Sequence, residues 1–381
     1  MLAVLMFLGG LLLLLYAALM QWYHQTRQLL PTFHLAEDYE PQVPLIILIP
    51  ARNEETSIEA CLRSLQTQHY PSHLWRCIVI DDHSTDQTGH RVLDLQDTRI
   101  QLLKLADEGA MELAGGKKQA LQLGIDRSTE PFVLTTDADC ILPTNWLRSM
   151  AYHFECKRAW FVSGNVVFTP DQNGFERFQA LDLLGMMGLT MAGIASGMMH
   201  LGNGANLGFA REAFLAAGGY TGNADRASGD DVFLAQKIGA LAPDRMFYLA
   251  NPTLAVQTPP VPSWSAFVQQ RVRWGNKTGQ YSDKRLIAVA ALVFFLCLWI
   301  LLAIPASLWL GSPLFLGALG VWLGKALVDY HYLSSLANAF DRPDLLHSFW
   351  LSEWYHTIYI AWVGILANVQ QNYRWKGRKL R

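Results

Sequence analysis

Long uninterrupted apolar stretches lie at both ends of the chain. They are residues 2–20, 286–310, 313–333 and 349–369. A run of about 20 apolar residues is long enough to span a bilayer as a helix. We therefore expect an N-terminal transmembrane anchor over residues 1–24 and a group of transmembrane or interfacial helices over residues 286–370.

The flanks of the first apolar stretch favour a retained anchor over the alternative, a cleaved signal peptide. No basic residue precedes it, whereas a secretory signal begins with basic residues, and Arg27 is the first cation after it. This charge distribution places the N-terminus outside and the following chain in the cytosol. Three further crossings would leave the strongly basic tail, residues 371–381, on the outside. One segment is therefore expected to lie in the membrane interface, and the last, with Glu353 and His356, is the candidate.

Between these ends, residues 41–280 show the pattern of one globular α/β domain. The strand candidates are short apolar runs at residues 44–50, 75–80 and 132–136. Residues 54–68, between the first two runs, carry apolar side chains at helical spacing. Strands that alternate with helices predict a mainly parallel sheet, whose buried strands are continuous apolar runs.

Two features within apolar segments have open interpretations. Residues 178–201 are rich in Met, Gly and Leu and contain Asp182. They are expected to form either an amphipathic helix on the membrane face or an ordinary core helix. Lys325 and Asp329 lie four residues apart in the third apolar stretch. Such a pair is either structural or functional, because ionisable groups in lipid face one another or a cavity.

Composition narrows the class of protein. Of the 381 residues, 51% are hydrophobic and 16% are charged, and the formal net charge is −2. A soluble domain carries about 25% charged residues, so part of this chain does not face water. High hydrophobicity excludes disorder, and the lack of a basic excess argues against nucleic acid as a partner. Five cysteines without a CxxC pair argue against a disulfide framework or a structural zinc site and fit a reducing compartment.

Polar clusters follow all three strand candidates, at residues 51–55, 81–86 and 137–139. In open α/β sheets, ligands bind at the carboxyl ends of the strands. Asp137 and Asp139 are two residues apart, so both side chains point to the same side of an extended segment. Paired carboxylates suit Mg²⁺ or Mn²⁺, whose coordination a diphosphate would complete.

Five motifs follow one another along the chain. They are IPARNEE at residues 49–55, IDDHSTD at 80–86, GGKKQAL at 115–121, TDAD at 136–139, and GDD at 229–231 with QRVRW at 270–274. In this order they resemble the membrane-anchored family 2 inverting glycosyltransferases with a GT-A fold. That family includes cellulose, chitin and hyaluronan synthases and the ceramide glucosyltransferases. The resemblance covers about residues 44–275.

The resemblance implies a role for each matching residue on the donor side. The implied contacts of the nucleotide base and ribose are Ala51, Arg52, Glu54, Asp81 and Asp82. Lys117 would lie near the nucleotide. Asp137 and Asp139 would form the DxD motif, with Asp139 as the first choice for a direct ligand of the divalent cation.

On the acceptor side, the resemblance implies that Asp231 is the general base. Its neighbour Asp230 departs mildly from the family, because many members have Glu there. The implied lining of the acceptor and diphosphate site is Gln270, Arg273 and Trp274, and residues 203–206 (NGAN) resemble a stretch near the acceptor. Trp274 has an alternative role as an interfacial anchor. Arg271, between the motif residues, is expected to contact lipid headgroups.

The leading hypothesis is an inverting glycosyltransferase of the cell membrane. It would move a sugar from a nucleotide-diphospho-sugar to a hydroxyl of a lipid, lipid-linked or glycan acceptor at the cytosolic face. One alternative is a processive polysaccharide synthase whose pore requires an oligomer or an export partner, since about four membrane segments are few for a channel. The others are a nucleotidyltransferase, which would release pyrophosphate, and a non-enzymatic transporter or scaffold.

Overall fold

The computed structural model describes residues 1–108, 116–221, 229–369, 373–375 and 378–380. Gly115 of the third motif and the side chains of the basic tail therefore lie outside the described residues. The chain divides into two compact units. The helical unit comprises residues 1–29, 170–192 and 260–371, and the sheet unit comprises residues 30–169, 193–259 and 372–381.

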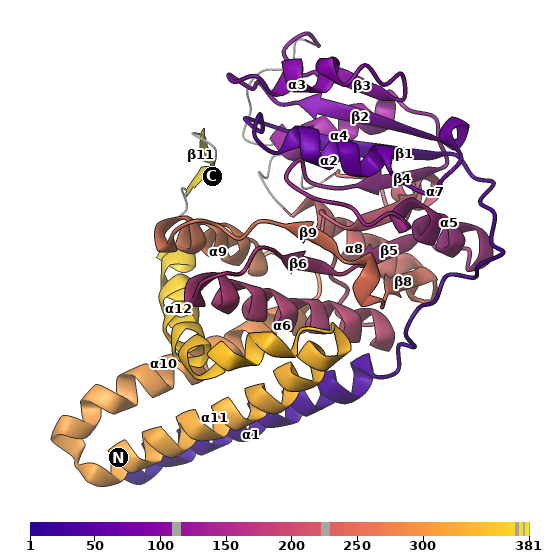
Figure 1. The fold of residues 1–381 in the computed structure, drawn as a ribbon. Coiled ribbons are helices and arrows are strands. Elements are labelled where there is room, and N and C mark those ends of the chain that lie inside the picture. The colour runs from indigo at the N-terminus through magenta and orange to yellow at the C-terminus, as the bar shows by residue number, and fades with distance from the viewer. Residues whose placement is uncertain (109–115, 222–228, 370–372, 376–377, 381) are drawn as a thin grey trace. The chain divides into compact units, whose positions relative to one another are not determined.

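The sheet unit contains the strands and the shorter helices (Figure 1). Its strands are β1 (Leu45–Ala51), β2 (Trp75–Asp81), β3 (Ile100–Lys104), β4 (Phe132–Thr135), β5 (Phe161–Gly164), β6 (Val166–Phe168), β7 (Leu207–Ala210), β8 (Met246–Leu249), β9 (Val256–Thr258), β10 (Tyr373–Trp375) and β11 (Arg378–Leu380). Its helices are α2 (Ile58–Gln66), α3 (Thr88–Asp94), α4 (Gly116–Asp126), α5 (Trp146–Cys156), α7 (Arg211–Ala216) and α8 (Asp230–Leu241), with short 3₁₀ turns at Ser72–Leu74, Pro243–Arg245 and Pro252–Leu254.

Seven strands form one mixed sheet in the order β3-β2-β1-β4-β7-β5-β8. β3, β2, β1 and β4 run parallel, β7 is antiparallel to both of its neighbours, and β5 and β8 are parallel to each other. Two further pairs, β6 with β9 and β10 with β11, make small sheets. The expected mainly parallel sheet is therefore present. Each of the three strands expected from sequence is present with bounds that differ by one residue: β1 begins and ends one residue later, β2 extends to Asp81, and β4 stops at Thr135.

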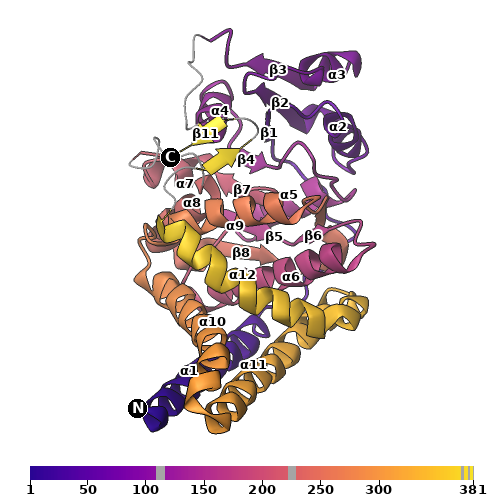
Figure 2. The same ribbon diagram turned by 90° about the vertical axis from the view of Figure 1, so that its left-hand side faces the viewer.

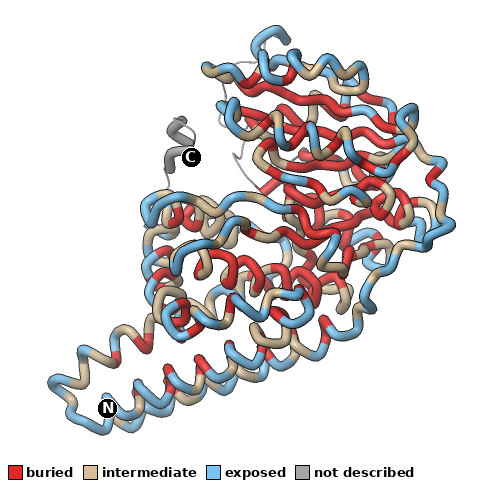
Figure 3. The backbone as a smooth tube through the Cα atoms, viewed as in Figure 1, coloured by how far each residue is buried: buried red, intermediate tan, exposed pale blue. Residues whose placement is uncertain are grey.

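Burial on both faces explains why β1, β2 and β4 are continuous apolar runs (Figure 3). α4 covers one face of these strands, and α2 and α3 lie on the other (Figure 2). α4 approaches β1 closely at Gly124, where a Cβ atom would lie 2.8 Å from the Leu48 side chain. A side chain at this position would push the helix off the sheet.

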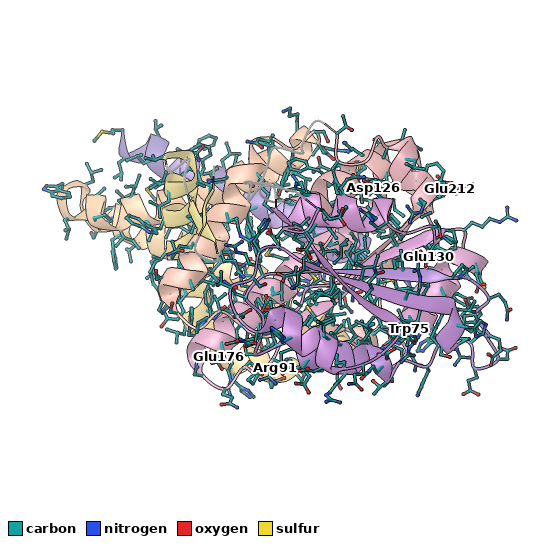
Figure 4. All side chains as sticks on the ribbon, turned by 90° about the horizontal axis from the view of Figure 1, so that it is seen from above. Trp75, Arg91, Asp126, Glu130, Glu176 and Glu212 are labelled. Carbon is teal, nitrogen blue, oxygen red and sulfur yellow. The ribbon has the colours of Figure 1, made fainter. Side chains whose placement is uncertain are left out.

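The amino-terminal edge of the parallel strands carries structural ion pairs. Trp75 begins β2, and Glu130 lies just before β4; both are labelled in Figure 4. Arg76 pairs with Glu130 at 2.6 Å, and the Arg99 guanidinium lies over the Trp75 ring at 4.2 Å. The first contact links β2 to the start of β4 across β1, and the second links β2 to the residue before β3. The polar clusters predicted from sequence lie at the opposite edge.

The helical unit consists of helices, most of which are long and apolar, whereas α9 is shorter and largely polar. They are α1 (Leu2–Arg27), α6 (Gly174–Ser196, whose last turn falls in the sheet unit), α9 (Trp264–Thr278), α10 (Lys284–Leu310), α11 (Ser312–Ala339) and α12 (Phe349–Val369), with a 3₁₀ segment at Pro343–Ser348. Among the described residues, four of these helices are long and apolar enough to cross a membrane, namely α1, α6, α10 and α11.

The helices α1, α10 and α11 pack closely against one another (Figures 1 and 2). A Cβ atom at Gly9 of α1 would lie 2.4 Å from the Trp299 ring of α10, and one at Gly324 of α11 would lie 2.6 Å from Leu13 of α1. Small residues at such crossings allow two helix backbones to approach closely. The outward faces of this bundle are exposed and apolar, for example at Phe7 and Leu327.

Candidate active site

The loops after β1 and β2 are joined at the carboxyl edge of the sheet. In register, Ala51 at the end of β1 lies beside Asp81 at the end of β2. The buried Arg52 donates from Nη1 to the carbonyl oxygen of Asp82 at 2.9 Å. Asn53 adopts a left-handed conformation with φ of 53°, and its Oδ1 accepts from the Thr85 backbone N–H at 2.8 Å. The first two motifs therefore form one structure.

Carboxylates within these loops have local partners that shape the turn. Asp81 is buried, and its Oδ1 accepts from the Ser84 backbone N–H at 2.8 Å. Glu54 accepts from the Ser57 hydroxyl at 2.8 Å, near the start of α2. Asp86 accepts from the Thr88 backbone N–H at 3.0 Å. Partial burial by itself would raise the pKa of Asp86, but hydrogen bonds to its carboxylate outweigh burial and lower that pKa. Asp86 therefore acts as a turn former at the start of α3.

The third strand end carries the DxD pair. Asp137 and Asp139 follow β4, and both are partly exposed. Asp137 Oδ1 lies 2.5 Å from the ammonium of Lys117, on the first turn of α4. The Cys140 thiol lies 3.8 Å from Asp139 Oδ1. Of the sequence-predicted donor-side residues, Lys117 and Asp137 are thus in direct contact.

The segment of residues 203–206 connects this strand end to α8. The hydroxyls of Thr135 and Thr136 donate to the carbonyl oxygens of Gly204 and Ala205 at 3.0 and 2.9 Å. The Gly204 backbone N–H in turn donates to Asp231 Oδ2 at 3.1 Å. Sequence patterns do not reveal the two threonines as positioning groups, because their partners lie 69 residues away.

Asp230 and Asp231 occupy the first turn of α8, where the helix dipole stabilises negative charge. Asp230 is buried, and its Oδ2 lies 3.9 Å from the Lys117 ammonium. Asp231 is half-buried, and its Oδ1 also accepts from the Val232 backbone N–H at 2.8 Å. Both oxygens of the Asp231 carboxylate are therefore oriented by backbone donors.

Gly204 marks the point on which these groups converge. A Cβ atom there would lie 3.3 Å from Lys117 Nζ, 3.6 Å from Asp230 Oδ2 and 3.7 Å from Asp231 Cβ. The sheet unit thus brings three predicted residues together around Gly204, two acids and one cation, and Asp137 contacts the same lysine. Burial, and then the charges of Asp230 and Asp231, raise the pKa of the buried Tyr220.

The chemistry of the donor set fits a divalent cation. Asp137 and Asp139 supply hard carboxylate oxygens from a strand end, which suit Mg²⁺ or Mn²⁺. The Lys117 ammonium already provides one positive charge at Asp137. A divalent cation would add two positive charges beside these carboxylates and could hold the oxygens of a diphosphate.

The remaining predicted residues, Gln270, Arg273 and Trp274, lie on α9 in the helical unit. The expectation that Arg271 contacts lipid headgroups is wrong. Its side chain is 4% exposed and pairs with Asp182 of α6 at 2.7 Å. The roles of Gln270, Arg273 and Trp274 beside an acceptor stay predictions.

A second group of ionisable residues lies within the helical unit. The expected pair is present, with Lys325 Nζ 2.7 Å from Asp329 Oδ2. The same ammonium lies 2.6 Å from Glu353 Oε1 and 3.2 Å from His356 Nδ1. One ligand atom from each of Asp329, Glu353 and His356 falls within 4.8 Å of the others, as in a metal site. Lys325, which is fully buried, supplies a positive charge between the carboxylates of Asp329 and Glu353.

Comparison with known proteins shows the family. A model described as glycosyl transferase family 2 matches residues 46–212, and one described as glycosyl transferase family group 2 matches residues 132–368, which is more than half of the chain. The mannosyltransferase PcManGT from Pyrobaculum calidifontis, solved with GDP-Man and Mn²⁺, has the same fold, with a TM-score of 0.60. It is 18% identical, and the match covers 96% of this chain and 99% of that one.

Curated relatives are similar over shorter stretches. The UDP-Glc:alpha-D-GlcNAc-diphosphoundecaprenol beta-1,3-glucosyltransferase WfgD of Escherichia coli is 33% identical over 134 residues, 35% of this chain and 50% of WfgD. The beta-monoglucosyldiacylglycerol synthase of Nostoc sp. is 27% identical over 130 residues, 34% of this chain and 27% of that protein. The matches thus span half or less of the length of these relatives.

The narrower resemblance to polysaccharide synthases and ceramide glucosyltransferases stays a prediction. The mixed, mainly parallel sheet is that of the GT-A fold, as expected from the motifs. With the family models spanning both the carboxylate site and the helices after it, the chain belongs to the family 2 glycosyltransferases.

Proposed function

We propose that this protein transfers a sugar from a nucleotide-diphospho-sugar to a hydroxyl of a lipid or lipid-linked acceptor, with inversion at the anomeric carbon. The observation that carries the proposal is the convergence of Lys117, Asp230 and Asp231 around Gly204, with Asp137 bound to the same lysine. This arrangement combines a cation for a diphosphate with an oriented carboxylate for an acceptor.

In this proposal, the loops after β1 and β2 hold the nucleotide. Ala51, Arg52, Glu54, Asp81 and Asp82 are its contacts. Lys117 offers its ammonium to the diphosphate. A divalent cation held by Asp139 and Asp137 would neutralise the leaving diphosphate.

Asp231 is the proposed general base, and Asp230 lies beside it. The acceptor hydroxyl gives its proton to Asp231 while its oxygen forms a bond to the anomeric carbon. The bond from that carbon to the diphosphate oxygen breaks, and the nucleoside diphosphate leaves with the electron pair. Attack from the face opposite the leaving group inverts the configuration in one step. On α9, Arg273 offers a planar donor to phosphate oxygens, and Gln270 and Trp274 offer a hydrogen-bonding group and an aromatic face to the acceptor.

Two observations support a membrane acceptor. WfgD is named for a diphosphoundecaprenol-linked sugar and the Nostoc protein for a diacylglycerol product. In this chain, α1, α10 and α11 form an apolar bundle, which we propose as the membrane anchor of a protein with its sheet unit in the cytosol. Crossing by these three helices, with α12 in the interface, would leave the basic tail in the cytosol as the positive-inside rule requires.

The test is a screen of nucleotide-sugars with the full chain purified in detergent. UDP- and GDP-linked sugars are offered with added diacylglycerol or with N-acetylglucosaminyl diphosphoundecaprenol, and released nucleoside diphosphate and glycolipid are measured. We expect one donor to give both products in equal amounts. Release of pyrophosphate from a nucleoside triphosphate would favour a nucleotidyltransferase, and long glycan chains would favour a processive synthase. Turnover of no donor with any acceptor would overturn the proposal.

A further inference from the structure

Arg271 lies between the residues of the QxxRW motif and is one of the most buried charged side chains of the helical unit. Its Nη2 donates to Asp182 Oδ2 at 2.7 Å, and the hydroxyl of Tyr359 donates to the other oxygen, Asp182 Oδ1, at 2.5 Å. The carboxylate of α6 is thus shared between α9 and α12. A buried charge pair that is also hydrogen-bonded on its second oxygen holds its members in one geometry.

The same guanidinium contacts two of the motif residues. Its Nη1 donates to Gln270 Oε1 at 3.1 Å, and its central carbon lies 4.2 Å from the centre of the Trp274 ring. The ring of Phe267, one helical turn earlier, lies 4.5 Å from the same carbon. Arg271 therefore bonds the carboxamide of Gln270 and covers one face of the indole of Trp274.

The contacts with Arg271 fix the orientations of Gln270 and Trp274. Because Gln270 uses its carbonyl oxygen to accept from Arg271, the orientation of its amide NH₂ is set by that bond. Because the guanidinium lies against Trp274, the plane of the indole is set as well. Both side chains are the ones proposed to meet the acceptor, whereas Arg271 itself is enclosed.

We propose that Arg271, held by Asp182 and Tyr359, is the positioning residue of the acceptor side of the enzyme. It fixes the side chains of Gln270 and Trp274 in the orientation that receives the acceptor. This inference rests on the proposed function, which it deepens by naming the group that organises the acceptor side.

A plain structural salt bridge is the competing explanation, and the conservative variant Arg271→Lys separates the two. Lysine keeps the charge for Asp182 but lacks the planar fork that reaches Gln270 and stacks on Trp274. We expect the acceptor KM to rise about tenfold, which corresponds to about 1.4 kcal/mol, while the donor KM changes by less than about twofold. Tyr359→Phe, which removes only the hydroxyl, should raise the acceptor KM by about threefold. The control Arg285→Lys, at an exposed guanidinium that pairs with Asp283, should leave both constants unchanged.

A double-mutant cycle tests whether Arg271 acts through its neighbours. If it does, Arg271→Lys adds little to the acceptor KM of a Gln270→Ala, Trp274→Phe double variant. A fully additive increase, or a loss of thermal stability with an unchanged acceptor KM, would overturn the inference.

A spectroscopic readout needs no acceptor and so separates this inference from the proposed function. The near-ultraviolet circular dichroism of Arg271→Lys should differ from that of the wild type, and the difference should vanish in a Trp274→Phe background. Identical spectra for Arg271→Lys and wild type would contradict the positioning role even if the enzyme proves active. Failure of the nucleotide-sugar screen alone would instead count against the proposed function.

Discussion

The ammonium of Lys117 lies 2.5 Å from Oδ1 of Asp137, across the space between the first turn of α4 and the end of β4. Burial by itself would lower the pKa of Lys117, but the charges of Asp137 and then Asp230 outweigh it and raise that pKa. The lysine is therefore a permanent cation at the centre of the site. It balances carboxylates that would otherwise repel one another.

Replacing Lys117 by Met should change metal and donor binding in opposite directions. Without the ammonium, the carboxylates attract a divalent cation more strongly, so Mn²⁺ alone should bind about tenfold tighter. The diphosphate of the donor loses a cation, so the nucleotide-sugar should bind about tenfold more weakly. Titration calorimetry with Mn²⁺ and with donor checks both. A parallel loss of both affinities would show that Lys117 only maintains the fold.

Asp231→Asn should retain donor binding and lose transfer. The amide keeps the size of the side chain and can still accept from the Gly204 N–H, but it cannot take a proton from the acceptor. We expect the rate of glycolipid formation to fall by 10²-fold or more, on the order expected for a general base, with a donor affinity within about threefold. Asp244→Asn, in the 3₁₀ turn before β8, serves as the control. Unchanged transfer by Asp231→Asn would assign the base to another residue.

Asp139→Ala should abolish the metal-dependent release of the nucleoside diphosphate. The proposed metal ligand is removed, while the ion pair of Lys117 with Asp137 remains. Treatment of the wild type with a chelator should reduce release to the same level, and Mn²⁺ or Mg²⁺ should restore the wild type only. Full turnover after chelation would argue against a divalent cation in the reaction.

His153 should make the sheet unit sensitive to acid. Burial lowers its pKa to about 4, although its Nδ1 lies 2.8 Å from the Ser149 carbonyl oxygen. The unfolded chain, with a pKa of about 6.5 at this residue, binds the proton first. The stabilisation from the neutral imidazole is therefore complete above pH 6.5 and is lost as the pH falls from 6.5 towards 4, by about 3 kcal/mol.

His153→Phe removes the titratable imidazole. The new ring would lie among aromatic neighbours, because His153 contacts Phe33 and Phe247. Thermal melting between pH 7 and pH 4.5 should show a smaller loss of stability for the variant than for the wild type. His73→Gln, at an exposed position, should follow the wild type. Parallel acid profiles for wild type and His153→Phe would exclude His153 as the origin of the sensitivity.

Lys325→Met should destabilise the helical unit. The variant removes the cation between Asp329 and Glu353 and leaves buried carboxylates without compensation, at a cost of about 3 kcal/mol. Adding Asp329→Asn and Glu353→Gln should recover part of that loss, because neutral amides can hydrogen-bond without a counter-ion. Melting in detergent measures both changes, with the exposed Lys284→Met as the control. No recovery in the triple variant would mean that lost packing, and not charge, sets the effect.

Local patterns predict the strands that precede the donor-side loops, but they do not predict α4, which carries Lys117. β1, β2 and β4 are apolar on both faces, so their sequences are continuous hydrophobic runs that need no partner to be recognised. The sequence does not predict β3, because IQLLK is only half-buried at the edge of the sheet and lacks a continuous apolar run. The antiparallel β7, in which Gly208 pairs with Leu134 of β4, likewise shows no hydrophobic periodicity. The local sequence does not predict the burial of Arg271, because its partner Asp182 lies 89 residues away.

The amino-acid sequence alone determined the class of fold, the apolar helices at both ends and the acidic clusters that follow the strands, because hydrophobic periodicity and strand-end chemistry are local properties of the chain. Only the tertiary structure decided which charges meet. Lys117 with Asp137, Arg271 with Asp182, and Lys325 with Glu353 each join separate elements. Such pairs depend on how helices and strands pack, and a charged residue read in isolation shows neither its burial nor its partner.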